Sequence, residues 1–99
     1  MSIENECISK EEVLNIPASE VIIIDVRSIE EYNEGHIKNV LHIPLANLAS
    51  KLEIFEKNKL FVTACGKGGG RSIESAKLLM QNGFNAAWLC GGSIGWLNS

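Results

Sequence analysis

Val21-Ile22-Ile23-Ile24-Asp25-Val26 is the stretch of this sequence that decides the fold. It is a run of β-branched apolar residues interrupted only by Asp25, without the alternation of apolar and polar residues that marks a strand with one face in water. A continuous run of this kind fits a strand that is buried on both faces, which is the usual position of a strand in a parallel sheet. The run therefore predicts an α/β protein.

The segments on both sides of this run alternate between strand and helix patterns. Ser9 with Glu12 and Ser28 with Glu31 have the spacing of capping boxes, and later apolar residues recur every three or four positions. Strands are expected at 21–26, 40–43, 60–64 and 86–90, and helices at 9–15, 29–33, 45–55, 73–80 and 94–97. This order predicts a mainly parallel sheet of about four or five strands, with helices on both faces and right-handed crossovers.

The bulk composition limits the classes of function. With 99 residues, of which 45% are hydrophobic, the chain fits one domain over 1–99 with one core. Its formal net charge is −3 and it has no cluster of lysine or arginine, which argues against a nucleic-acid partner. Small molecules or protein partners are favoured.

The cysteines and histidines point to a cytoplasmic protein without a metal. Cys7, Cys65 and Cys90 are too few for a disulfide scaffold and fit a reducing compartment, with Cys90 expected in the core. His36 and His42 do not combine with them into a zinc spacing. The acidic start resembles no secretory signal and no apolar run approaches the length of a membrane span, so no membrane partner is expected.

A glycine-rich loop joins the expected strand 60–64 to the helix that follows it. It reads Cys65-Gly66-Lys67-Gly68-Gly69-Gly70-Arg71-Ser72. Its glycines let several backbone N–H groups turn toward one point and form a nest for an anion. Arg71 adds a planar, positively charged guanidinium that can bind an oxyanion through two hydrogen bonds. Positive charge near a thiol also lowers its pKa. The loop therefore predicts an anion-binding site around a reactive Cys65, the alternative being an inert cysteine in a tight turn.

Other interpretations of these residues have less support. The loop lacks the Gly-Lys-Ser/Thr ending of a nucleotide-binding P-loop, and no histidine has the context of a protease base.

Asp25 and Arg27 lie at the same sheet edge as Cys65, where Asp25 either pairs with Arg27, braces the loop or caps local N–H groups. His36 follows Gly35 in a turn and is expected to be structural.

The ordered set of motifs resembles the rhodanese family over nearly the whole chain. The matching pieces are Asp25-Val26-Arg27, Glu31-Tyr32, Gly35-His36-Ile37, Ile43-Pro44, the Cys65 loop ending in Arg71-Ser72, and Leu89-Cys90-Gly91-Gly92 with Trp96. The resemblance implies a three-layer α/β domain and an enzyme, a sulfurtransferase. In it Cys65 takes a sulfane sulfur from a small anionic donor, such as thiosulfate or a polysulfide, as a persulfide. The sulfur passes to cyanide, a thiol or an acceptor protein, while the N–H groups from Gly66 to Arg71 cradle the persulfide. No metal or organic cofactor is implied.

One departure from the family leaves alternatives open. Five residues separate Cys65 from Arg71, where common rhodanese loops have one fewer. The longer loop is similar to that of cysteine phosphatases, so a phosphatase or an arsenate reductase is the main alternative. Ala64 stands where many of those phosphatases have a histidine, and no general acid can be assigned. A non-catalytic rhodanese binding module is the third alternative, although such modules typically lack the active cysteine.

Overall fold

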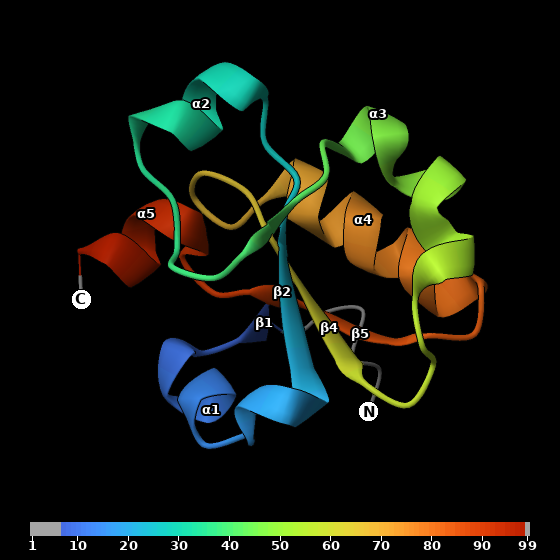
Figure 1. The fold of residues 1–99 in the computed structure, drawn as a ribbon. Coiled ribbons are helices and arrows are strands. Elements are labelled where there is room, and N and C mark those ends of the chain that lie inside the picture. The colour runs from blue at the N-terminus through green and yellow to red at the C-terminus, as the bar shows by residue number, and fades with distance from the viewer. Residues whose placement is uncertain (1–6, 99) are drawn as a thin grey trace.

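A five-stranded parallel sheet forms the centre of the computed structural model, which describes residues 7–98 (Figure 1). The strands are β1 (Cys7–Ile8), β2 (Val21–Asp25), β3 (Leu41–His42), β4 (Leu60–Ala64) and β5 (Asn85–Leu89). The helices are α1 (Lys10–Leu14), α2 (Ile29–Glu34), α3 (Leu45–Leu48), α4 (Gly70–Gln81) and α5 (Gly92–Leu97), with 3-10 helices η2 (Ala18–Glu20) and η3 (Ala49–Ile54). The strand order is β1-β5-β4-β2-β3, which confirms the α/β fold with a parallel sheet.

The pairing of β2 with β4 brings the two conspicuous sequence motifs to one edge of the sheet. Their register places Ile24 beside Thr63 and Asp25 beside Ala64. Asp25 and Cys65 therefore lie at the carboxyl ends of neighbouring parallel strands. Open α/β sheets bind ligands at this edge.

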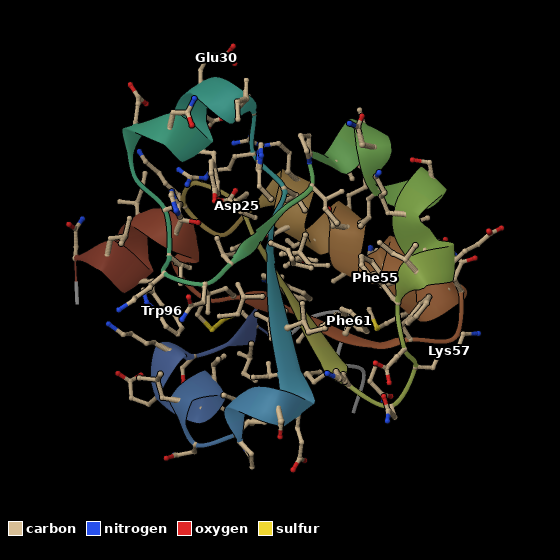
Figure 2. The ribbon with its side chains drawn as sticks, in the orientation of Figure 1. Asp25, Glu30, Phe55, Lys57, Phe61 and Trp96 are labelled. Atoms are coloured by element: carbon tan, nitrogen blue, oxygen red, sulfur yellow. A yellow bond between two sulfur atoms is a disulfide. The ribbon has the colours of Figure 1, made fainter. Side chains whose placement is uncertain are left out.

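The two faces of the sheet bury separate sets of apolar side chains. One cluster joins Phe61 and Ile24 to Leu79 of α4 and includes Phe84 and Trp88. The rings of Phe55 and Phe61 pack against each other in this layer at a tilt of 35°, with centroids 5.0 Å apart (Figure 2). The other cluster packs Val13 of α1 against Val62 and Leu89, with Trp96 of α5 at its margin. Helices thus cover both faces, as the sequence predicts.

Three details of the fold differ from the sequence-based expectations. The edge strand β1 was not expected, because two residues carry too little pattern to be recognised. The helix expected at 45–55 is divided into α3 and η3, since apolar spacing does not separate α from 3-10 geometry. Val21–Ile23 are only half-buried, although their apolar run predicts burial on both faces, because the helices do not fully cover these positions.

A disulfide joins Cys7 in β1 to Cys90 after β5. Cys90 is half-buried, so the expectation of a free core cysteine at this position is wrong. The two strands are neighbours, with Cys7 beside Trp88 and the Cys90 N–H donating to the Ile8 carbonyl at 2.8 Å. Sequence reasoning does not reveal this pairing, because the two cysteines are separated by 83 positions.

We expect the disulfide to stabilise the fold, because it closes a loop of 83 residues and fastens a strand only two residues long. Replacing both Cys7 and Cys90 with serine should lower the free energy of unfolding by about 2–3 kcal/mol. Denaturant unfolding measures this change. Wild-type protein in a reducing agent should match the double variant, and equal stability of all three samples would contradict the expectation.

Candidate active site

Cys65 begins the glycine loop at the end of β4, and its side chain is surrounded by the loop that follows. The residue is 4% exposed. The Gly69 N–H donates to Sγ over 3.2 Å, and the thiol donates to the Ser72 hydroxyl over 3.3 Å. The Ser72 hydroxyl in turn donates to the Gly69 carbonyl at 2.9 Å. The loop therefore encloses the sulfur within a small hydrogen-bond network.

This network favours the ionised thiol. Burial raises the pKa of Cys65, but hydrogen bonds to the thiolate outweigh it; they come from the Ser72 hydroxyl, which can turn to donate once the thiol has lost its proton, and from the backbone N–H groups of Gly69, Ser72 and Gly68. The net result is a pKa below the ordinary value for cysteine. A thiolate is the nucleophilic form of cysteine, so the loop prepares Cys65 for attack on an electrophile.

The lowered pKa can be tested by alkylation, since Cys65 is the free cysteine of this protein. The rate with iodoacetamide follows the thiolate fraction, and should rise at lower pH than for an ordinary cysteine. Ser72→Ala removes the largest hydrogen-bond contribution, so its profile should move to higher pH. The matched control is Ser75→Ala, because Ser75 donates to the Arg71 carbonyl instead. Identical profiles for wild type and Ser72→Ala would show that Ser72 does not stabilise the thiolate.

The first turn of α5 packs against the loop. The Ser93 N–H donates to the Cys65 carbonyl at 2.7 Å, and the Ile94 N–H donates to the Gly66 carbonyl at 3.0 Å. Gly92 has a φ of +63°, and a Cβ placed there would lie 2.5 Å from the Cys65 carbonyl oxygen. The turn and the loop are thus packed backbone against backbone, which requires glycine at this position.

Among residues 7–98, the Arg71 guanidinium is hydrogen-bonded to a carboxylate and not to Cys65. Its Nη1 and Nη2 bind the two carboxylate oxygens of Glu31 in α2, at 2.6 and 3.0 Å. Both side chains are partly exposed, at 43% and 37%. The expected anion-binding guanidinium is therefore paired with a carboxylate at the rim of the loop.

Asp25 and Arg27 form a buried ion pair beside the loop. Arg27 Nη2 donates to the Asp25 carboxylate at 2.7 Å and to the Gly35 carbonyl at 2.7 Å. The Arg27 N–H donates to the same carboxylate at 3.0 Å. Of the alternatives left open by the sequence, the pairing of Asp25 with Arg27 is present, and it ties the end of β2 to the turn after α2.

The histidines belong to an aromatic stack away from the thiol. The Tyr32 ring lies between His36 and His42, with centroid distances of 3.9 and 4.3 Å. His42 Nε2 also lies 2.8 Å from the Arg27 carbonyl. Among residues 7–98, neither histidine has a hydrogen bond to Cys65, so neither is placed to take its proton.

The remaining loop residues differ in their exposure. Lys67 and Gly70 are exposed, whereas Gly66, Gly68 and Gly69 are half-buried and Ser72 is buried. Glu31 is the residue that sequence reasoning missed: its capping-box spacing was recognised, but not its pairing with Arg71. Nothing in the sequence signals a contact between residues 40 positions apart.

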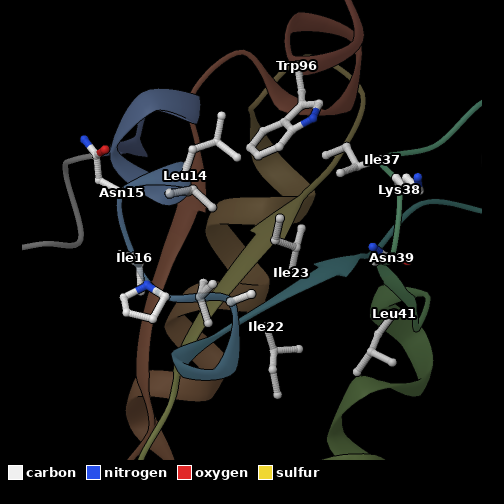
Figure 3. Close-up of a pocket in the computed structure, with 14 residues that line it drawn as sticks. Leu14, Asn15, Ile16, Ile22, Ile23, Ile37, Lys38, Asn39, Leu41 and Trp96 are labelled. Carbon is white, nitrogen blue, oxygen red and sulfur yellow. The ribbon is translucent and has the colours of Figure 1, made fainter.

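The apolar hollow in Figure 3 lies elsewhere on the molecule. Its volume is about 720 Å³, and Ile23, Ile37 and Trp96 are among the side chains around it. Its lining includes no residue of the Cys65 loop. This hollow is therefore not part of the candidate site around Cys65, which is formed by the glycine loop.

The described residues contain neither a metal site nor a membrane span. Within residues 7–98 no group of three or more His, Cys, Asp or Glu side chains is arranged to hold a metal ion. Over the same range no helix is both long and apolar enough to cross a membrane.

Comparison with known proteins identifies the family. Residues 9–99 match the model of the rhodanese-like domain. The chain is 36% identical over 77 residues to the putative sulfurtransferase YtwF of Bacillus subtilis, covering 78% of this chain and 74% of the relative. It is 34% identical over 79 residues to the thiosulfate sulfurtransferase GlpE of Coxiella burnetii, covering 78% and 72%.

A solved structure gives the same result. The crystal structure of a rhodanese-like domain protein from Staphylococcus aureus aligns with a TM-score of 0.76 and 34% identity, over 87% of this chain and 85% of that one. Fold and sequence similarity agree, and the chain belongs to the rhodanese-like domain family.

Proposed function

We propose that this chain is a sulfurtransferase in which Cys65 carries a sulfane sulfur as a persulfide. The observation that carries the proposal is the enclosed thiol whose pKa is lowered by hydrogen bonds from Ser72, Gly69 and Gly68 against the cost of burial. The names of its relatives, a putative sulfurtransferase and a thiosulfate sulfurtransferase, support the same class of reaction. Residues 1–99 act as one domain in this proposal.

The reaction proceeds in two displacements at sulfur. The Cys65 thiolate attacks the outer sulfur of thiosulfate, the S–S bond of the donor breaks, and sulfite leaves with the bonding electron pair. The outer sulfur of the new persulfide is then attacked by cyanide or a thiolate, and Cys65 leaves as the thiolate. No net oxidation of the protein occurs over the cycle.

The loop residues stabilise the charge that develops on sulfur. The N–H groups near Sγ, those of Gly68, Gly69 and Ser72, act on the anionic persulfide as fixed dipoles that need no reorganisation. Gly66, Lys67 and Gly70 complete the loop, and exposed Lys67 adds positive charge for an approaching anion. The hydrogen-bonded pair of Asp25 and Arg27 stabilises the carboxyl end of β2, next to the loop.

The partners in this proposal are a small anionic sulfur donor and a thiol or acceptor protein. The cytoplasmic location stays a prediction. Reducing compartments such as the cytoplasm usually keep cysteines as thiols, so the disulfide between Cys7 and Cys90 would be reduced there.

A phosphatase or arsenate reductase remains the competing function because of the loop length. The pairing of Arg71 with Glu31 argues against phosphate chemistry, since a phosphate dianion needs the guanidinium that Glu31 occupies, whereas sulfur transfer can also use donors that carry less charge. The test is a parallel assay of thiocyanate formation from thiosulfate and cyanide, and of hydrolysis of a generic aryl phosphate. Sulfur transfer without phosphate hydrolysis supports the proposal. Phosphate hydrolysis alone would favour the phosphatase, and inactivity in both assays would favour the binding module.

A further inference from the structure

Arg71 and Glu31 form a bidentate ion pair at the rim of the Cys65 loop. Two nearly parallel hydrogen bonds of 2.6 and 3.0 Å join the guanidinium to both carboxylate oxygens. This bidentate arrangement is the strongest that an arginine forms with a carboxylate. It uses one N–H of each Nη atom, the pair of donors that would otherwise be available to bind an incoming anion in the same bidentate way.

Glu31 is held in position by a second set of contacts. It is the third residue of α2, and its Oε1 accepts from the Ser28 N–H at 3.2 Å and from the Ser28 hydroxyl at 3.1 Å. The hydrogen bond from Arg71 lowers the pKa of Glu31 to about 2, so its carboxylate is charged at neutral pH. The carboxylate is thus a fixed negative charge, built into the start of a helix.

The ion pair lies close enough to Cys65 to affect the anionic sulfur donors that approach it. Arg71 follows the loop directly as the second residue of α4. Glu31 raises the pKa of Arg71 first by its hydrogen bond and again by its charge, and the charge of Cys65 raises it further. An anion that approaches Cys65 therefore meets the guanidinium together with the carboxylate that neutralises it.

We propose that Glu31 determines donor specificity at this site, because its charge cancels that of Arg71 and so reduces the preference for doubly charged donors such as thiosulfate. This inference rests on the proposed sulfur transfer and names the donor class that the site favours: sulfane sulfur donors that carry a single negative charge. Because Arg71 and Glu31 contribute opposite charges, the net rim charge of the four possible proteins is fixed by simple subtraction. It is neutral in wild type, one unit positive in Glu31→Gln, one unit negative in Arg71→Ala, and neutral again in the double variant.

Two donors with the same leaving chemistry and different charge make the comparison. Thiosulfate, a dianion, gives its outer sulfur to the Cys65 thiolate and leaves as sulfite. Benzenethiosulfonate, a monoanion, gives its outer sulfur in the same way and leaves as benzenesulfinate. In both reactions one S–S bond breaks, one forms, and total charge is conserved.

The Glu31→Gln variant is suited to the test because glutamine keeps the capping box. Its side-chain oxygen can still accept from the Ser28 N–H, so α2 should remain formed. Glu30→Gln is the matched control: it removes one negative charge from the neighbouring exposed position, and the Arg71 ion pair in residues 7–98 is made with Glu31 and not with Glu30.

Thiosulfate is expected to respond more strongly than benzenethiosulfonate to the rim charge. Because Coulomb energy scales with donor charge, each unit of rim charge should change kcat/KM about tenfold for the dianion and about threefold for the monoanion. For thiosulfate the expected order is Glu31→Gln, then wild type and the double variant together, then Arg71→Ala. Glu30→Gln should resemble wild type, and added salt should reduce the gain of Glu31→Gln.

The outcomes separate this inference from the proposed function. If both donors load wild-type Cys65 but Glu31→Gln leaves their kcat/KM ratio unchanged, sulfur transfer stands and the role of Glu31 is rejected. A fall in thiosulfate use by Glu31→Gln would also reject it, since Glu31 would then be aiming Arg71 at the anion. Failure of wild-type protein to accept sulfur from either donor would reject both proposals.

Discussion

Replacing Cys65 with serine should reduce sulfur transfer from thiosulfate by about a thousandfold or more, as expected when a covalent nucleophile is removed. A serine hydroxyl is not ionised at neutral pH and forms no persulfide, so neither displacement can occur. The measurement is the initial rate of thiocyanate formation with cyanide as the acceptor. A Cys65→Ser protein with wild-type activity would remove Cys65 from the mechanism.

The fold should tolerate this substitution. Serine keeps a polar atom near the Gly69 N–H and the Ser72 hydroxyl, both of which contact Sγ in the wild type. Thermal unfolding should therefore change little. Unchanged circular dichroism together with lost activity is the combination that assigns a chemical role to Cys65.

The second large effect is expected at Gly92, where a methyl group has no room. A Cβ there would lie 2.5 Å from both the Cys65 carbonyl oxygen and the Gly68 nitrogen, at a φ of +63°. Left-handed strain costs about 1–3 kcal/mol and overpacking costs a similar amount, so Gly92→Ala should lower the free energy of unfolding by about 4 kcal/mol. Because the obstructing atoms belong to the loop itself, sulfur transfer should fall as well.

Gly70→Ala is the matched control within the loop. Nothing lies within 4 Å of a Cβ at Gly70, its φ is not positive, and it begins α4. Alanine there should leave stability unchanged or raise it by about 0.5 kcal/mol, because it restricts the unfolded chain. Equal stability losses in Gly70→Ala and Gly92→Ala would contradict the close packing of turn against loop.

The parts of the fold that could be predicted are those with a local pattern. The apolar run at 21–26 and the strand at 60–64 pair as β2 and β4, and their register brings Asp25 and Cys65 to one edge. The glycine loop was recognised because its residue types are unusual within a few positions. Hydrophobic periodicity and turn chemistry act over short distances, so sequence reasoning reaches such features.

The features that could not be predicted depend on contacts between distant positions. Arg71 was expected to face an anion, and it pairs with Glu31, 40 residues earlier. Cys90 was expected in the core, and it is bonded to Cys7 across 83 positions. Charged and thiol side chains have several possible partners, and only the folded arrangement selects among them.

The most direct test of the account is the mass of the protein after treatment with thiosulfate and removal of excess donor. We predict an adduct of one sulfur atom, located on the peptide that contains Cys65, absent from Cys65→Ser and released by cyanide as thiocyanate. Wild-type protein without a sulfur adduct, or with the adduct on another residue, would contradict the central claim that Cys65 carries sulfur.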